Sequence, residues 1–181
     1  MADGPQTRIR RLEAREWKKL RGIRLEMIED SPSAYVESLA SARAQSEEQW
    51  QGRAAAMAGP GSVALVADDG RDGSPLRALM RVVTKLPQNG TRPRQAMLIS
   101  VYVAPEHRGS GLADRMLRQA IEAARTELGA GVLQLGVHED NGRAQRFYLR
   151  HGFQDTGARE PYPLDTDQSE IIMERVLPTE A

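Results

Sequence analysis

Two glycines and an arginine stand between an apolar run and a helical pattern in the stretch VYVAPEHRGSGLADRMLRQAIEAA, residues 101–124. Pro105 cannot donate to a strand ladder, so strand pairing is expected to end there. Gly109 and Gly111 permit backbone angles that side chains forbid, and the apolar residues after them recur at helical spacing. The start of such a helix carries free N–H groups and positive partial charge, and Arg108 adds a cation. These features together predict a site for an anion such as a diphosphate.

A purely structural role for the same turn is open as well. Glycines before a helix often only make a tight strand-to-helix connection, and a lone arginine is usually solvated. Two other phosphate-binding motifs are not matched: no Gly-Lys-Ser/Thr is present, and Asp114 stands where a dinucleotide fingerprint requires its third glycine. The local pattern therefore supports neither of these two nucleotide folds.

Composition narrows the classes of function. The chain has 181 residues, 40% of them hydrophobic, with 25 Lys and Arg against 25 Asp and Glu and no long block of one sign. Binding of nucleic acid or of an anionic membrane is therefore not expected. The chain has no cysteine and only three histidines, so we expect neither disulfides nor a metal site. No apolar leader and no stretch long enough to span a bilayer is visible, and a cytoplasmic protein is predicted.

The elements that would position the turn form an α+β pattern. Period-2 and continuous apolar runs predict strands, and helical spacing predicts helices between them. Strands are expected at 7–12, twice within 61–85, and at 94–103, 131–137 and 169–177, and helices at 13–30, twice within 32–59, and at 112–124 and 141–152. We predict a single domain over 1–181, with a mixed, mainly antiparallel sheet flanked by helices, and with disordered ends at 1–6 and 178–181.

The segment VYVAPEHRGSGLADRML and the later segment HEDNGRAQRFYLRHGF together resemble the GNAT superfamily of acyl-coenzyme A-dependent N-acyltransferases. The acyl-donor signature of that family is Arg/Gln-x-x-Gly-x-Gly/Ala, and residues 108–113 fit it as Arg-Gly-x-Gly-x-Ala. The resemblance is strong over about residues 96–153 and looser over the preceding strands and helices. It implies the GNAT fold and acetyl-coenzyme A as the acyl donor.

The resemblance also implies roles for individual residues. The backbone amides of the turn would hold the coenzyme A diphosphate, and the strand around Ser100–Val103 would run beside the pantetheine arm and polarise the thioester carbonyl near Val103. Asn141 would contact the arm, and Tyr148 would protonate the departing thiolate. The implied donor-binding residues are Val101, Tyr102, Val103, Arg108, Gly109, Ser110, Gly111, Leu112, Ala113 and Asn141.

The expected reaction is transfer of the acetyl group to a primary amine by direct attack in a ternary complex. A thiol with a pKa of about 8.5 leaves, and a tyrosine with an ordinary pKa of about 10 is protonated at neutral pH and can donate to it. A cysteine acyl-enzyme is impossible because the chain has no cysteine. Two alternatives stay open: a catalytically silent coenzyme A-binding regulatory module, and an acyltransferase with a non-acetyl donor.

Several of these residues have simpler interpretations. Tyr148 could pack in the core beside neighbouring aromatic residues. Asn141 equally suits the N-cap of the helix that follows it. His138 could face the acceptor as a base, although a histidine at a strand edge is more often solvated. Surface positions are expected for His107 and His151.

The general base and the acceptor are less determined. Many GNAT relatives place a carboxylate on or near the central strand, but residues 95–103 contain no Asp or Glu. The nearest alternatives are Ser100, Tyr102, His138 and Glu139. The segment 30–50 would form one wall of the acceptor cleft, with contacts suited to a cation, unless its aromatic residues are core anchors; the residues concerned are Tyr35, Glu37 and Trp50. A small-molecule or peptide amine is the expected partner, and a homodimer is plausible for the family.

Overall fold

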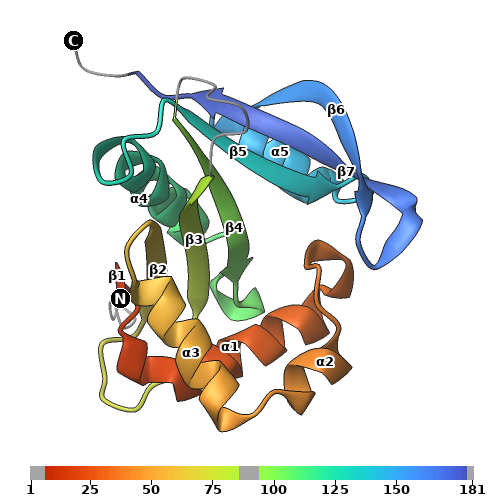
Figure 1. Ribbon diagram of the computed structural model, residues 1–181. Helices are drawn as coiled ribbons and strands as arrows, with labels where there is room; N and C mark the ends of the chain where they lie inside the picture. Colours follow the sequence, from red (N-terminus) through yellow and green to blue (C-terminus); the bar gives the residue numbers. More distant parts are fainter. Residues whose placement is uncertain (1–6, 86–93, 179–181) are drawn as a thin grey trace.

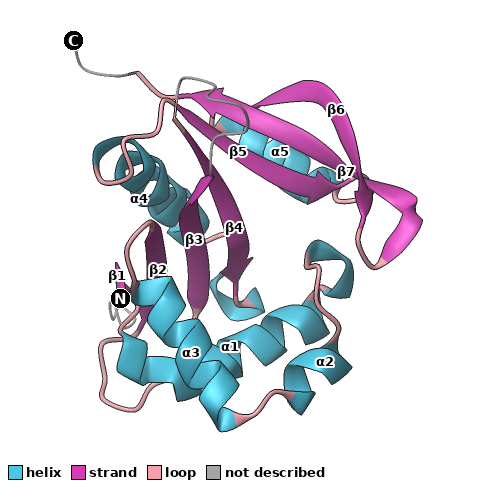
Figure 2. Cartoon of the chain, viewed as in Figure 1, coloured by secondary structure: helices cyan, strands magenta, loops and turns pink. Residues whose placement is uncertain are grey.

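The computed structural model describes residues 7–85 and 94–178, which fold around one seven-stranded sheet (Figure 1). The strands are β1 (Arg8–Arg11), β2 (Ser62–Asp68), β3 (Ala78–Lys85), β4 (Gln95–Val103), β5 (Val132–His138), β6 (Gln154–Tyr162) and β7 (Asp165–Val176). The helices are α1 (Trp17–Asp30), α2 (Leu39–Ala44), α3 (Glu47–Ala58), α4 (Leu112–Thr126) and α5 (Gly142–Arg150) (Figure 2). Short 3₁₀ turns lie at η1 (Ala14–Glu16), η2 (Pro32–Ala34) and η3 (Pro105–His107).

The sheet is mixed but mainly antiparallel. Its strands follow the order β1-β2-β3-β4-β5-β7-β6, and every neighbouring pair is antiparallel except β4 and β5, which run parallel. α4 and α5 pack on one face, and α1, α2 and α3 pack on the other. The predicted α+β class, with a mainly antiparallel sheet flanked by helices, is confirmed.

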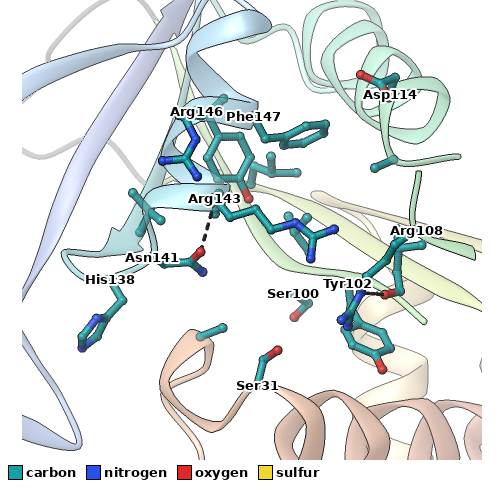
Figure 3. Close-up of a pocket in the computed structure, with 18 of the residues that line it drawn as sticks. Ser31, Ser100, Tyr102, Arg108, Asp114, His138, Asn141, Arg143, Arg146 and Phe147 are labelled. Atoms are coloured by element: carbon teal, nitrogen blue, oxygen red, sulfur yellow. Dashed lines mark hydrogen bonds between the residues drawn. The ribbon is translucent and has the colours of Figure 1, made fainter. Parts of the chain in front are cut away.

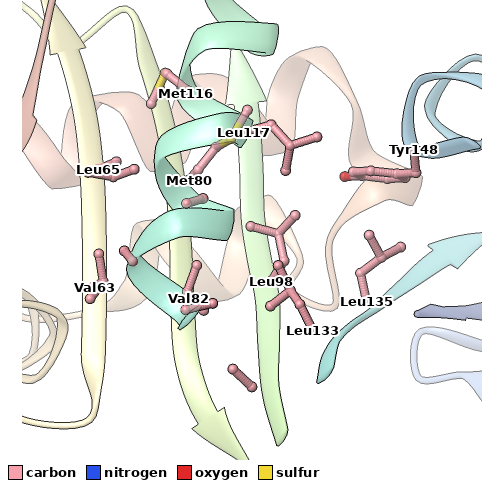
Figure 4. Close-up of a cluster of buried hydrophobic side chains, with 14 of the residues drawn as sticks. Val63, Leu65, Met80, Val82, Leu98, Met116, Leu117, Leu133, Leu135 and Tyr148 are labelled. Carbon is pink, nitrogen blue, oxygen red and sulfur yellow. The ribbon is translucent and has the colours of Figure 1, made fainter. Parts of the chain in front are cut away.

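The first core cluster lies between the sheet and α4 (Figure 4). Alternate residues of the strands point into it, as the period of two along a strand requires. It includes Val63, Leu65, Met80, Val82, Leu98, Leu133 and Leu135 from the strands and Leu112, Met116, Leu117, Ala120 and Ala124 from α4. The helix face expected after the glycine turn is therefore the buried face, and its burial fixes where the N-terminus of α4 points.

The second core cluster lies on the opposite face, beneath α1 and α3. Ser46 is the N-cap of α3: the Ser46 side chain accepts from the Gln49 N–H at 3.2 Å, and the Gln49 side chain accepts from the Ser46 N–H at 2.8 Å. Trp50 and Met27 are fully or almost fully buried here. This layer positions the far wall of the cleft described below.

β4 carries a bulge where it leaves its neighbour β5. Leu79 pairs with Tyr102 and Arg81 pairs with Ile99, so β4 has one extra residue in this interval. Ser100 takes up the irregularity with φ of 54°, a left-handed angle that is uncommon for a residue other than glycine. β4 and β5 pair only over Gln95–Met97 and diverge beyond the bulge, as Figure 1 shows.

The C-terminal hairpin departs from the sequence prediction. Only residues 169–177 were expected to form a strand, but β7 begins at Asp165 and pairs with β6, which was not predicted. Nearly every residue of β6 is exposed, so the strand lacks the apolar pattern on which the prediction depended.

The predicted ends at 1–6 and 179–181 lie outside the described residues, whereas Pro178 is described and exposed. Among the helices in the described ranges, none has the length and apolar character needed to cross a membrane.

Candidate active site

A cavity of about 590 Å³ lies in the gap where β4 and β5 diverge (Figure 3). Its lining comes from β4, β5, the turn before α4, the first turns of α5 and the η2 segment. Nine of the eleven residues named for the site from the sequence line it: Val101, Tyr102, Val103, Arg108, Gly109, Gly111, Ala113, Asn141 and Tyr148. Ser110 and Leu112 belong to the same turn, where Leu112 is buried in the core.

The turn before α4 has the form that an anion site needs. Gly109 and Gly111 have φ of 77° and 76°, and Gly111 is the N-cap of α4. A Cβ on Gly109 would meet nothing within 4 Å, so the turn is open on that side. Within the described part of the chain, no hydrogen bond occupies the N–H groups of Gly109, Ser110 and Gly111. Free donors at the positive end of a helix fit a diphosphate.

Arg108 holds this turn against the protein and does not point freely outward. Its Nε donates to the Val103 carbonyl at 3.0 Å, and its guanidinium forms an ion pair with Asp30 and lies 5.7 Å from the centre of the Tyr102 ring. Burial alone would lower the pKa of Arg108, but the hydrogen bond with Asp30 keeps it above the ordinary value. The turn is thereby tied to the end of α1, and the backbone is left as the main source of anion contacts.

Further positive charge in the cavity comes from α5. The arginines that line the cavity from this helix are Arg143, Arg146 and Arg150. They lie three and four residues apart and therefore share one face of α5, and Figure 3 shows Arg143 and Arg146 beside the open space. Their charges suit a polyanionic ligand.

The edge of β4 that faces the cavity offers backbone groups. The Val101 carbonyl accepts the Tyr35 hydroxyl at 2.8 Å, and the Val103 carbonyl accepts Arg108. In an extended strand the N–H and the carbonyl of one residue point to the same side. The N–H of Val103 is therefore directed to the side of the cavity, where β5 no longer pairs with the strand.

Tyr148 lies on α5 with its ring in the first core cluster and its hydroxyl toward β4 (Figure 4). The residue is 7% exposed, and no described residue hydrogen-bonds its hydroxyl. Burial raises the pKa of this phenol, so it is protonated at neutral pH. The core-packing interpretation and the proton-donor interpretation are therefore compatible, because the ring serves one and the hydroxyl the other.

Asn141 and His138 both have structural partners. The Asn141 side chain accepts from the Ala144 N–H at 3.1 Å and caps α5. His138 is 4% exposed, and its Nδ1 accepts the Asp140 N–H at 3.2 Å while its Nε2 lies 2.5 Å from the Gln168 side-chain oxygen. Both ring nitrogens of His138 therefore have partners within the protein, which disfavours His138 as a base.

The other two histidines are less exposed than expected. His107 is half-buried and lines the cavity. His151 is also half-buried, and its Nε2 lies 2.8 Å from the Asp114 carboxylate, so it links α5 to α4. His151 is therefore a structural residue of the two donor-side helices.

The wall formed by residues 30–50 differs from the one expected. Tyr35 and Trp50 are 7% and 1% exposed, as core anchors are. Glu37 accepts hydrogen bonds from Arg24, Arg53 and Gln45 at 2.8–3.1 Å. Its charge is thus neutralised within the protein, and it offers no acidic contact to an acceptor.

A carboxylate that the sequence did not single out lies close to the cavity. Glu170 of β7 pairs with His138 and is half-buried, and its carboxylate lies 3.2–3.4 Å from where a Cβ on Gly136 would stand. No described residue hydrogen-bonds or ion-pairs with it. Burial, and then the charge of Glu160, raise the pKa of Glu170. Gly136 lines the cavity, so Glu170 is the unpaired carboxylate next to it.

Two of the other candidates for a base, Tyr102 and Glu139, form hydrogen bonds within the protein. The Tyr102 hydroxyl donates to Glu26 at 3.0 Å, and burial raises its pKa. Glu139 is exposed and accepts the Ser169 N–H at 2.8 Å. In the described residues no group of three or more acidic or histidine side chains is arranged to hold a metal ion.

Comparison with known proteins gives one family. The model of the acetyltransferase (GNAT) family matches residues 24–153. A Bacillus subtilis protein with the provisional name ribosomal protein bS18-alanine N-acetyltransferase is 33% identical over 78 residues, which are 43% of this chain and 51% of that protein. The chain thus spans about half the length of that relative.

Solved structures share the fold over almost the whole chain. A GNAT-family acetyltransferase from Streptococcus pneumoniae superposes with a TM-score of 0.76 at 17% identity, covering 96% of this chain and 100% of that one. The protein yncA of Salmonella typhimurium, whose structure was solved with its cofactor acetyl-CoA, gives 0.75 at 21% identity, covering 97% and 96%.

Proposed function

The chain belongs to the acetyltransferase (GNAT) family, and from this membership we propose that it transfers the acetyl group of acetyl-coenzyme A to a primary amine by direct attack within a ternary complex. The observation that carries the proposal is the glycine turn at the N-terminus of α4, which opens onto the gap between β4 and β5. The small-molecule or peptide amine and the thioester would meet in that gap.

Each part of the donor half has a defined task. The N–H groups of the turn at Gly109–Gly111 bind the diphosphate, and the arginines of α5 offset the remaining negative charge. The N–H of Val103 hydrogen-bonds the acetyl oxygen, on which negative charge develops as the amine attacks. Bound acetyl-coenzyme A supplies the activated thioester. Tyr148 donates its phenolic proton to the departing sulfur.

We assign the general base to Glu170. The other candidates suit this role less well: the Tyr102 hydroxyl donates to Glu26, the acceptor nitrogen of His138 is bonded to the Asp140 N–H, and Glu139 is exposed and bonded to the Ser169 N–H. Ser100 offers only a neutral hydroxyl, which is a weaker base than a carboxylate. A carboxylate with a raised pKa accepts a proton more readily than an ordinary one. The position of Glu170 above Gly136 places it on the acceptor side of the sheet, opposite the donor turn.

Calorimetric titration tests the donor half first. Acetyl-coenzyme A should bind tightly, dephospho-coenzyme A somewhat less so, and free pantetheine, which lacks the diphosphate, very weakly. No binding by the folded wild-type protein would refute the proposal.

Thiol release with a panel of amines tests the transfer itself. Acetylated amine identified by mass, with intersecting double-reciprocal lines when both substrates are varied, supports direct attack. Parallel lines would contradict the ternary complex. Tight donor binding with no product from any amine would indicate the silent regulatory module, and turnover only with longer acyl groups would indicate a non-acetyl donor.

A further inference from the structure

Behind the catalytic cavity lies a second, smaller cavity of about 120 Å³, enclosed by α1, α3, β3 and β4. Its polar lining consists of Arg24, Arg53, Arg81 and Ser100, and the remaining lining residues are apolar apart from backbone. One water occupies about 30 Å³ in the liquid, so the space accommodates a group of the size of a carboxylate.

The charges around this cavity do not balance. Arg24 is 7% exposed and donates to Glu37 at 2.9 Å, and Arg53 donates to the same carboxylate at 2.8 and 3.1 Å. Burial alone would raise the pKa of Glu37, but these hydrogen bonds hold it below its ordinary value. One carboxylate therefore forms ion pairs with two arginines, which leaves a net positive charge.

Arg81 has no carboxylate partner among the described residues. Its Nε donates to the Ser62 hydroxyl at 2.8 Å and its Nη2 lies 3.5 Å from the Ala56 carbonyl, both neutral acceptors. Burial, followed by the charge of Arg53, lowers the pKa of Arg81. No described carboxylate therefore offsets the charge of this guanidinium, and an anionic ligand would supply its partner.

The small cavity borders the catalytic one. Ser100, the residue with the left-handed φ, lines both cavities. Arg24 lies 5.1 Å from the centre of the Tyr35 ring, and Tyr35 lines the catalytic cavity. Arg81 is paired with Ile99 across one strand spacing, which is about 4.8 Å. The two cavities are therefore neighbours on either side of Ser100.

The acceptor face of the sheet thus has negative charge at one end and positive charge at the other. The unpaired carboxylate of Glu170 lies on the β7 side of the gap, and the unpaired guanidinium of Arg81 lies on the β3 side. An amine with a negatively charged group at its other end matches this order, with its amine toward Glu170 and its anion toward the arginines. A polyamine would place a second cation against three arginines.

We propose that the cavity formed by Arg24, Arg53 and Arg81 binds the carboxylate of the acceptor, which makes the acceptor a primary amine that carries a carboxylate. This inference rests on the proposed acetyl transfer for its amine end. The carboxylate end rests only on the arginine cavity, so the two are tested separately.

Matched pairs of amines with and without a carboxylate provide the first test. We would compare glycine with methylamine, β-alanine with ethylamine, 4-aminobutanoate with propylamine, and L-leucine with 3-methylbutylamine. For at least one pair, kcat/KM is expected to be about 10- to 100-fold higher for the acid, because a hydrogen bond to a charged group contributes a factor of about that size. Equal or better use of the decarboxylated amines in every pair would overturn the inference and leave the acetyl transfer intact.

Variants locate the effect. Arg81→Gln should lower the preference for the acid about 10- to 100-fold through KM. Arg81→Lys should lower it less, because lysine keeps the positive charge although it lacks the two parallel N–H donors with which arginine binds a carboxylate. Arg125→Gln is the matched control, because it removes the same charge from the Glu122 ion pair on the surface of α4. An unchanged preference in a folded Arg81→Gln protein would place the carboxylate elsewhere.

Equilibrium binding separates this inference from turnover. Calorimetric titration of the protein saturated with coenzyme A should detect the preferred amino acid in the wild type and not in Arg81→Gln, even if no acetyl group is transferred. No binding of any of the four amino acids would refute the carboxylate site, whatever the donor titration shows.

Discussion

The two halves of the cleft are built from different atoms. In the proposed function, the donor half uses backbone N–H groups at Gly109–Gly111 and Val103, which are supplied by one continuous segment of chain. The proposed acceptor half uses side chains, and they come from α1, α3, β3 and β7, which are far apart in the sequence. Backbone donors at a helix start suit any diphosphate, whereas side chains gathered from many elements select one kind of molecule.

The difference predicts how each half responds to mutation. A change in the donor turn should weaken every reaction of the protein equally, since every acceptor needs the same donor. A change in the acceptor half should alter which amine reacts, or at which pH, with donor binding unchanged. Variants of single residues distinguish these outcomes.

Replacement of Glu170 should have the largest effect. Glu170→Gln removes the proposed base, and general-base catalysis typically contributes about 10²–10⁴-fold, so we expect kcat/KM at pH 8 to fall about 10²- to 10³-fold with unchanged affinity for acetyl-coenzyme A. Because the pKa of Glu170 is raised in the folded protein, wild-type activity should rise as the pH increases through that pKa. The variant should lack this limb of the pH profile.

Stability gives an independent check on the same residue. A carboxyl with a raised folded-state pKa contributes to stability at low pH, and that contribution is lost as the pH rises through the folded pKa. Glu170→Gln should therefore unfold at a temperature no lower than the wild type at pH 8. Glu174→Gln, on the same strand and bonded to Gln134 at 3.2 Å, is the matched control and should retain the pH limb. An intact limb in Glu170→Gln would remove Glu170 as the base.

The donor turn should give the next largest effect. Gly111→Val places a β-branched residue at φ of 76°, which costs about 1–3 kcal/mol, and the turn is expected to relax and lose its N–H array. Calorimetry should show affinity for acetyl-coenzyme A reduced about 100-fold, with the ranking of amines unchanged. Gly22→Val, in a helix with open space around the glycine, should leave the affinity as it was. A changed ranking of the amines in Gly111→Val would show that the donor half and the acceptor half do not act independently.

Tyr148→Phe should affect chemistry alone and by less. A thiol with a pKa of about 8.5 is already a good leaving group, so loss of the proton donor should lower kcat about 10- to 100-fold. The ring remains in the core, so the unfolding temperature and the acetyl-coenzyme A affinity should be almost unchanged. Tyr162→Phe, which loses the hydrogen bonds to the Tyr35 carbonyl at 2.9 Å and to the Pro32 carbonyl at 3.4 Å, should keep its kcat. Equal rates for Tyr148→Phe and wild type would show that the thiolate leaves unaided.

The same division explains what could be predicted from the sequence. The donor half follows from local signals, because the strand end, the glycines and the helix stripe lie within one stretch of 24 residues. β6 could not be predicted, because its residues face solvent and carry no apolar period. Glu170 and Arg81 gain their meaning only from sheet register, which places Glu170 opposite His138 and Arg81 opposite Ile99. Single-sequence patterns do not specify such pairings.

The bulge at Ser100 joins the two halves, and replacement of Ser100 by glycine should give the smallest effect. A residue with a Cβ pays about 1–2 kcal/mol in the left-handed region, which glycine does not. Glycine in turn loses more backbone entropy on folding, by about 0.5–1 kcal/mol. The net gain is at most about 1.5 kcal/mol, so Ser100→Gly should raise the unfolding temperature by no more than about 6 °C. The bulge persists in this variant, so both the donor affinity and the amine ranking should be kept.

Ser100→Val should instead lose both together, since a β-branched residue at φ of 54° would force β4 to straighten toward β5 and narrow both cavities. Loss of only one of the two properties in Ser100→Val would show that the halves are positioned independently of the bulge.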